Sequence, residues 1–220
     1  MLETAHSPTP DDLDTRQRLL EVAGAVFAEL GFRGATIRDI CQRANTNVAS
    51  IHYHFGDKEG LYHALLESAI DAAEVARPHA APEQFASPED ELAAFLRVFL
   101  GRLYGGGVPA WLMKILSREM FEPTGALEQL VRAVHRPTTE HLRGIVMRIG
   151  RGRMGEGDAV RCTQSIIAQC VFYKHAQAVL RLMGHAQPAT QAEIEALAGH
   201  VTRFSIAGIH ASASNLEEVR

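Results

Sequence analysis

The chain has 220 residues, of which 46% are hydrophobic and 22% charged, a balance typical of a globular protein and unlike that of a disordered chain. Its formal net charge of −4 argues mildly against a nucleic-acid partner, because nucleic-acid-binding domains are commonly basic. Three widely separated cysteines (Cys41, Cys162 and Cys170) and the absence of any run of about 18 apolar residues argue against a disulfide framework, a zinc site and a membrane span.

Apolar residues recur at helical spacing along almost the whole chain, and no segment shows sustained alternation, so the pattern predicts an all-α protein. The first helix covers residues 11–30 and stops at Gly31, and two short helices follow over 36–43 and 47–54. Further helices are predicted over 58–76, 88–104, 109–121, 125–149, 156–184 and 190–212. Pro137 should kink or split the helix that contains it, because proline removes a backbone donor.

The two short helices are joined in the manner of a helix-turn-helix. Thr36 is a predicted N-cap with Asp39 three residues later, a variant of the capping box. Asn45 lies in the turn, where the left-handed backbone conformation is needed, and Asn47 caps the second short helix. The side chains at i, i+3 and i+7 of that helix should pack inward: Val48, Ile51 and Phe55.

The second short helix carries small and polar side chains near its start, which suits a DNA major groove because bulk there would hold the backbone away from the bases. The next helix begins at Lys58, after the predicted cap Asp57, so an anion there would meet both an ammonium group and the helix dipole. Between residues 36 and 58, three basic side chains stand against two acidic ones, opposite in sign to the whole chain. We therefore expect this segment to contact DNA.

These residues resemble the N-terminal DNA-binding domain of the TetR family of repressors, over roughly residues 15–62. The match is close at Gly31-Phe32, at Thr36, at residues 38–40 and at residues 51–59, and it departs where Asn45 and Thr46 replace the usual Gly and Val. The resemblance implies base contacts from residues 47–50 and phosphate contacts around them. The DNA-binding residues predicted in this way are Thr36, Arg38, Asn47, Val48, Ala49, Ser50, His52, Tyr53, His54 and Lys58.

A second resemblance covers Leu116–Gly125 and the following helix through Pro137 to Leu142, which are similar to the CecR-type subfamily of TetR regulators. The resemblance implies control of efflux or detoxification genes, and release by a drug-like or other amphipathic small molecule. A homodimer that places two recognition helices in successive major grooves would bind a pseudo-palindromic operator in double-stranded DNA. The helical pattern places the domain boundary within the helix at 58–76, with residues 11–60 as the predicted DNA-binding domain and residues 61–214 as the predicted effector-binding and dimerisation domain.

A candidate effector pocket combines aromatic, soft and ionisable side chains on helices of the predicted bundle, since an apolar cavity with a few polar groups suits an amphipathic ligand. Arg118 and Glu119 stand out, because charges inside a bundle must be paired or contact something. Taken singly, each residue of the set also fits plain core packing. The set is Trp111, Met113, Arg118, Glu119, Phe121, Phe172, Tyr173 and His175.

The last two predicted helices carry an apolar stripe at intervals of three to four residues, which favours a four-helix interface between two subunits. A purely internal role for the stripe is the alternative. The predicted interface residues are Ile166, Cys170, Ala178, Ile194, Leu197, Val201 and Phe204.

Other patterns are interpreted as structural. Residues 150–155 spell G-x-G-x-x-G but follow a helical pattern rather than a strand, which favours an interhelical loop. Cys162 and Cys170 could share a helix face, yet buried cysteine usually acts as a small hydrophobe, so we expect no metal site. No nucleophile and base occur at an identifiable spacing, so we also expect no enzymatic activity and no cofactor. We expect a cytoplasmic location, since the N-terminal segment lacks the apolar region of a signal peptide. Two alternatives stay open: an activator of the same fold, and a helical carrier or enzyme whose helix-turn-helix is only structural.

Overall fold

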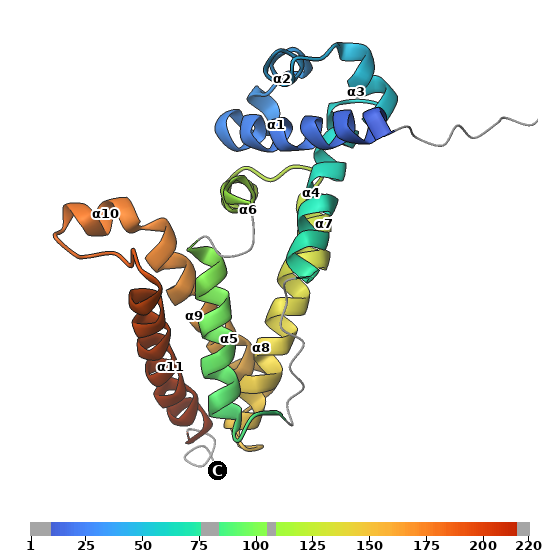
Figure 1. The fold of residues 1–220 in the computed structure, drawn as a ribbon. Helices are drawn as coiled ribbons and strands as arrows, with labels where there is room; N and C mark the ends of the chain where they lie inside the picture. The colour runs from blue at the N-terminus through green and yellow to red at the C-terminus, as the bar shows by residue number, and fades with distance from the viewer. Residues whose placement is uncertain (1–9, 76–83, 105–108, 215–220) are drawn as a thin grey trace, which may run out of the picture. The chain divides into compact units, whose positions relative to one another are not determined.

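The computed structural model describes residues 10–75, 84–104 and 109–214. Every regular element in these ranges is helical (Figure 1), which confirms the all-α prediction, and none of these helices is long and apolar enough to cross a membrane. The chain packs into two compact units. Unit 1 holds the described residues up to 75 together with 109–131, and unit 2 holds 84–104 together with 132–214.

Unit 1 contains α1 (Pro10–Gly34), α2 (Ile37–Ala44), α3 (Val48–Phe55), α4 (Lys58–Val75), α6 (Ala110–Phe121) and α7 (Leu127–Leu130). The first helix is its centre, because α1 packs against α2, α4 and α6. Fully buried apolar side chains from these helices, among them Phe27, Ile40, Ile51 and Leu61, form the core. Packing thus groups α4, α6 and α7 with the first three helices, so the two compact units differ from the division predicted within the helix at 58–76. The functional assignment of residues 11–60 and 61–214 stays a prediction.

Two glycines allow the helices of unit 1 to approach closely. A Cβ atom on Gly24 would lie 2.5 Å from the ring of Trp111, so glycine there lets α6 approach α1. A Cβ atom on Gly60 would lie 2.1 Å from the carbonyl oxygen of Phe55, so glycine there lets the start of α4 approach the end of α3. Both contacts are closer than any other residue would permit.

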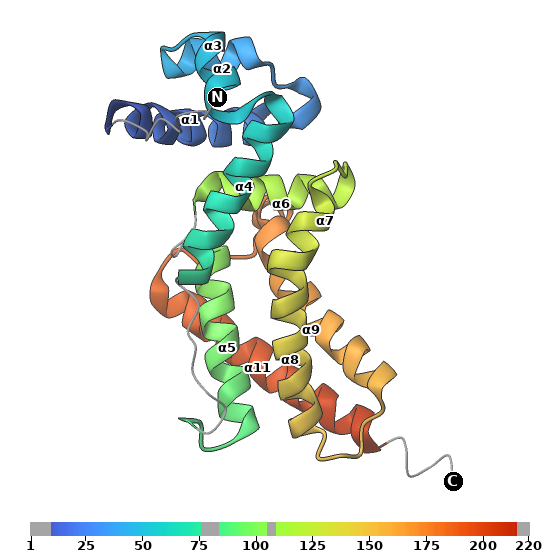
Figure 2. The same ribbon diagram turned by 90° about the vertical axis from the view of Figure 1, so that its right-hand side faces the viewer.

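Unit 2 contains α5 (Pro88–Leu103), α8 (Arg136–Ile149), α9 (Glu156–His175), α10 (Gln177–Leu182) and α11 (Gln191–Ser214). Four of these helices form a bundle in which α5 packs on α8 and α11, and α9 packs on α8 and α11 (Figures 1 and 2). The α5 helix begins with Ser87 as N-cap and Pro88 in the first turn, and it buries Leu92, Leu96 and Leu100 at helical spacing.

The helix boundaries confirm one prediction about a break and contradict another. The 125–149 pattern divides into α7, a π-helical segment (Val131–His135) and α8, and Pro137 lies at the start of α8 as expected of a residue that cannot donate inside a helix. The predicted continuous helix over 156–184 is wrong, because the chain leaves helical geometry at Ala176, between α9 and α10. Neither glycine nor proline marks that break. The G-x-G-x-x-G segment forms the loop between α8 and α9, as predicted.

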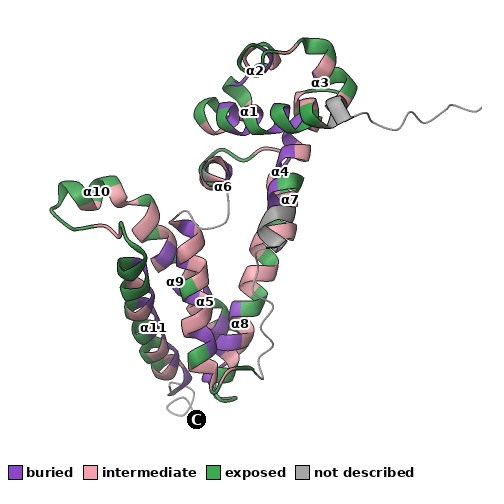
Figure 3. Ribbon diagram, in the orientation of Figure 1, coloured by how far each residue is buried: buried purple, intermediate pink, exposed green. Residues whose placement is uncertain are grey.

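Most of the predicted interface stripe belongs to the interior of unit 2. Four of its seven residues are buried within the chain itself, where α9 and α11 pack together: Ile166, Cys170, Ile194 and Val201. Their placement in an interface is therefore wrong, and the internal alternative holds for them, because apolar periodicity cannot tell which partner a face will meet. Phe204 is 62% exposed and Ala178 is exposed, whereas Leu197 is half-buried. Figure 3 shows that one side of α11 is exposed along its length.

Candidate functional site

The helix-turn-helix has the local geometry that its sequence predicts. The Thr36 hydroxyl oxygen accepts from the Asp39 backbone N–H at 3.2 Å, and the Asp39 carboxylate accepts from the Thr36 backbone N–H at 3.2 Å, which completes the capping box at the start of α2. Asn45 ends α2 in the left-handed region, with φ 50° and ψ 51°. Asn47 then caps α3, its side-chain oxygen accepting from the Ser50 N–H at 3.0 Å. Asn45, which ends α2, and Asn47, which caps α3, thus together fix the direction of α3 relative to α2.

The α3 helix is anchored on one side and exposed on the other. Ile51 is fully buried and Phe55 half-buried, as predicted, but Val48 is 39% exposed. The expectation that Val48 packs inward is wrong: the buried face of α3 that holds Ile51 does not extend one turn back to Val48, the first residue of the helix. Val48 instead lies on the side of α3 that also exposes Ala49.

The exposed side of α3 also carries His52 and Tyr53. His52 is exposed, and its Nδ1 donates to the Gly56 carbonyl oxygen at 2.5 Å. Tyr53 is 65% exposed, and His54, half-buried, lies with its ring 4.8 Å from that of Tyr53 in an edge-on arrangement. The Tyr53 side chain is therefore exposed, as a contact with DNA requires.

The charges around the helix-turn-helix are unevenly engaged. Arg43 pairs with Glu29 at 2.6 Å, and this bond with its charge lowers the pKa of Glu29. The Thr36 hydroxyl donates to the Asp39 carboxylate at 2.6 Å, and this hydrogen bond lowers the pKa of Asp39. Arg38 is exposed. Of these basic side chains, Arg38 is thus the better placed for an external anion.

Lys58 differs from the prediction. Its ammonium group donates to the carbonyl oxygens of Phe32 at 2.9 Å and Ala35 at 3.1 Å, and it lies 4.6 Å from the centre of the Phe32 ring. The predicted outward presentation of Lys58 is wrong, because the carbonyl groups after the kink at Gly31 offer the ammonium two acceptors. The predicted cap of the same helix is confirmed: the Asp57 carboxylate accepts from the Gly60 N–H at 2.8 Å. Lys58 therefore ties the start of α4 to the end of α1.

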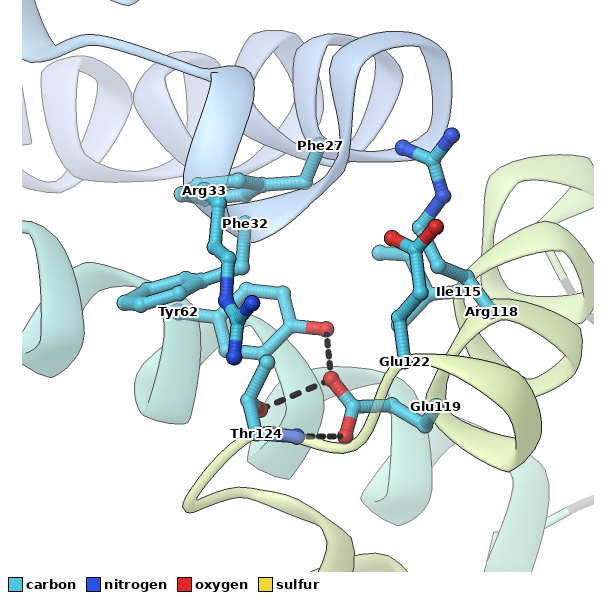
Figure 4. Close-up of a pocket in the computed structure, with 9 residues that line it drawn as sticks. All are labelled: Phe27, Phe32, Arg33, Tyr62, Ile115, Arg118, Glu119, Glu122 and Thr124. Carbon is cyan, nitrogen blue, oxygen red and sulfur yellow. Dashed lines mark hydrogen bonds between the residues drawn. The ribbon is translucent and has the colours of Figure 1, made fainter.

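A small cavity lies inside unit 1 where α1, α4 and α6 meet. It is lined by Phe27, Phe32, Arg33, Tyr62, Ile115, Arg118, Glu119, Glu122 and Thr124 (Figure 4). The space admits about one water molecule. In this form the cavity cannot hold a drug-sized ligand, which needs a few hundred cubic ångströms.

Glu119, which is 3% exposed, lines one side of this cavity with its buried carboxylate. It accepts from the Tyr62 hydroxyl at 2.8 Å, from the Thr124 N–H at 2.9 Å and from the Thr124 hydroxyl at 2.8 Å (Figure 4). Burial, and then the hydrogen bond to Glu119 and its charge, raise the pKa of Tyr62. The expectation that Glu119 must be paired is confirmed, and the pairing joins α6 to α4.

The predicted effector residues are divided between the two units. Arg118 and Glu119 line the cavity of unit 1, Trp111 and Met113 are half-buried in the same unit, and Tyr173 is half-buried in unit 2. Their grouping stays a prediction. Three members of the set are exposed rather than enclosed, which corrects their placement in a cavity: Phe121, Phe172 and His175.

Sequence reasoning missed Tyr62 as a partner of Glu119, since a hydrogen bond across 57 residues leaves no local spacing to detect, and it also missed Thr124, which is only five residues after Glu119. Gly24 and Gly60 could have been found, because glycine inside a helical pattern often marks a close approach. No group of three or more potential metal ligands occurs among the described residues. Burial also raises the pKa of the Cys170 thiol to about 12, which leaves it in its unreactive form.

A capped helix-turn-helix with one exposed face on its second helix, carried on further helices, is the architecture of a DNA-binding regulator. Two family profiles match the chain: "Bacterial regulatory proteins, tetR family" over residues 19–65, and "HTH-type transcriptional dual regulator CecR, C-terminal domain" over residues 88–209. The second match covers more than half of the chain. The chain therefore belongs to the tetR family of bacterial regulatory proteins, and its C-terminal region is of the CecR type.

Relatives and solved structures agree with this placement. The HTH-type transcriptional dual regulator CecR of Shigella flexneri is 34% identical over 140 residues, which cover 60% of this chain and 62% of CecR, less than two thirds of its length. A TetR transcriptional regulator of Chloroflexus aurantiacus has the same fold, with a TM-score of 0.63, 24% identity, and coverage of 89% of this chain and 96% of that one. The regulator FadR of Bacillus subtilis, solved in complex with stearoyl-CoA, gives a TM-score of 0.60 and 20% identity, with coverage of 88% and 99%.

Proposed function

We propose that this protein is a transcriptional regulator that binds a pseudo-palindromic operator through α3 and is released from it by a small amphipathic ligand. The observation that carries the proposal is the exposed face of α3, formed by Val48, Ala49, His52 and Tyr53 on a helix whose direction is fixed by two caps. Small side chains at the start of this face let the helix backbone approach base edges. Tyr53 and Arg38 supply groups for phosphate oxygens at its border.

A homodimer would present two such helices, one to each half-site, about 34 Å or a multiple of it apart. The exposed side of α11 supports a subunit contact: Phe204 is exposed there beside the small residues Ala207, Gly208 and Ala211. Small residues let a second helix approach closely, and a large exposed aromatic ring is a typical interface anchor. Phe204→Arg should therefore convert dimers to monomers in sedimentation velocity, whereas Arg203→Ala, next to it on the same helix, should leave dimers intact.

The coupling of a ligand to DNA binding follows from the contacts of α6 within unit 1. The α6 helix packs on α1 at Gly24, through Trp111, and its Glu119 accepts from Tyr62 of α4. A shift of α6 must therefore displace α1 or α4, which carry the helix-turn-helix. A ligand that prefers the shifted form would lower DNA affinity, and one that binds both forms equally would not. FadR, solved in complex with the amphipathic molecule stearoyl-CoA, supports an amphipathic ligand.

The direct test is footprinting of the purified full-length protein on the DNA that flanks its own gene, repeated with candidate amphipathic compounds. The proposal predicts two protected patches related by a pseudo-two-fold axis and lost on addition of one compound class. Retardation of any duplex without a protected sequence would contradict it. Because CecR is described as a dual regulator, a reporter assay should record both repression and activation.

A further inference from the structure

The Ser50 hydroxyl and the Asn47 side-chain oxygen, at the start of α3, are already engaged within the protein. The Asn47 side-chain oxygen accepts from both the N–H and the hydroxyl of Ser50, at 3.0 and 3.3 Å, and the Thr46 hydroxyl donates to the Ser50 hydroxyl oxygen at 3.0 Å. Ser50 is half-buried. A side chain whose hydrogen bonds hold the cap together is poorly placed to read a base, since reading would break the cap. Exposed side chains of α3 outside this cap are therefore better placed to discriminate between bases.

The exposed side chains of α3 outside this cap form one face, made of Val48, Ala49, His52 and Tyr53. Val48 and Ala49 lie four and three residues before His52, and side chains at these spacings are neighbours on a helix surface. Val48 and Ala49 can offer only apolar contact, for which the major groove has one partner, the methyl group of thymine. Tyr53, also on this face, is assigned above to phosphate oxygens, so His52 is the side chain of the face whose ring nitrogen is left to read a base.

The hydrogen bond from His52 to Gly56 determines what that ring atom can do. A carbonyl oxygen only accepts, so the Nδ1 that lies 2.5 Å from the Gly56 oxygen must carry the hydrogen. The neutral imidazole then keeps a lone pair on Nε2, which is an acceptor. Gly56 has φ 80° and ψ −63°, a conformation that other residues rarely adopt, so the glycine sets the position of the carbonyl and with it the tautomer.

We propose that His52 determines operator specificity as a hydrogen-bond acceptor: its Nε2 accepts from the exocyclic amino group of an adenine or cytosine, while Val48 and Ala49 contact a thymine methyl group at a neighbouring step. The proposal rests on the DNA-binding function given above and names the base chemistry of that site. Adenine N6 and cytosine N4 are the amino donors of the major groove, whereas guanine and thymine present acceptors to the same position. A guanine or thymine at that position would place an acceptor oxygen opposite the Nε2 lone pair, and the two would repel each other.

The test is selection of bound duplexes from a random-sequence library at pH 8, with the full-length protein and three variants. The wild type should prefer adenine or cytosine over guanine at one position of each half-site, by roughly fivefold or more. His52→Gln, whose amide binds adenine through N6 and N7, should retain only adenine. His52→Lys, a donor alone, should change the preference to guanine. The charge-matched control Gln191→Lys, exposed on α11 of unit 2, should select the wild-type site.

The outcomes distinguish a failure of the inference about His52 from a failure of the proposed DNA-binding function. If the wild type selects a defined pseudo-palindrome and His52→Lys selects the same one, His52 does not read a base, and the inference is overturned while the proposed function stands. If the wild type selects no sequence at all, both fail. Nitrogen-detected NMR of the free protein gives a second readout that needs no DNA. It should show hydrogen on Nδ1 of His52 at pH 8, and hydrogen on Nε2 would overturn the inference.

Discussion

Replacing Lys58 by methionine tests whether this lysine organises unit 1 or serves as a phosphate ligand. The substitution keeps most of the apolar stem and removes the ammonium group that donates to the carbonyls of Phe32 and Ala35. A hydrogen bond to a charged group contributes about 1.5–3 kcal/mol when buried, and a cation over a ring about 0.5–1 kcal/mol at an exposed site. Lys58 is half-buried, and water can replace part of what is lost. The free energy of unfolding of unit 1 should therefore fall by about 1–2 kcal/mol.

The assay is urea unfolding followed by the fluorescence of Trp111, the single tryptophan of the chain, which lies against α1 in unit 1 and so reports that unit. Lys114→Met is the matched control, because Lys114 is exposed on α6, and its effect should stay within about 0.5 kcal/mol. In DNA binding, Lys58→Met should leave the slope of log affinity against log salt unchanged, whereas loss of a phosphate contact lowers it by about 0.9. Unaltered stability together with a reduced slope would refute the structural role.

Two further substitutions test the interior of unit 1 with the same fluorescence assay. Tyr62→Phe removes one of the three hydrogen bonds to the buried Glu119 carboxylate and should cost about 1.5–3 kcal/mol, and a cost below about 0.5 kcal/mol would show that Glu119 does not depend on it. Gly60→Ala forces a Cβ atom against the Phe55 carbonyl and should destabilise the junction of α3 and α4 by about 1–3 kcal/mol. Gly34→Ala, on α1 of the same unit, where the new Cβ atom would meet only the Leu30 side chain at an ordinary 3.6 Å, should instead leave stability unchanged or raise it, and equal behaviour of the two variants would contradict the close approach.

The parts of the molecule that the sequence predicts well depend on neighbouring residues. The caps at Thr36 and Asn47 and the turn at Asn45 act within three or four residues, so their chemistry can be recognised from spacing alone. Pro137 likewise acts on its own helix. The helix-turn-helix, which is the candidate DNA-binding site, could therefore be placed to within one residue at each end.

The parts that the sequence predicts poorly depend on segments far apart in the chain. The direction of Lys58 is decided by carbonyl groups 23 and 26 residues earlier, and the Tyr62 hydroxyl that donates to Glu119 is 57 residues away. Periodicity showed that Ile166 and Val201 lie on apolar faces, but the same pattern fits a subunit interface and a bundle interior. Which polar groups of α3 are free was also hidden, because Ser50 and Asn47 have side chains suited equally to capping and to reading a base.

The most direct measurement of the central claim, that the exposed face of α3 enters the DNA groove, is the affinity of Ala49→Glu for the footprinted operator. Ala49 is exposed on that face, so a carboxylate there would stand against the negative charge of DNA without disturbing the core. Affinity should fall by roughly two orders of magnitude or more, the equivalent of about 3 kcal/mol. Ala86→Glu, which adds the same charge at an exposed position in unit 2, should bind as the wild type does. Equal affinities for Ala49→Glu and Ala86→Glu would contradict the account.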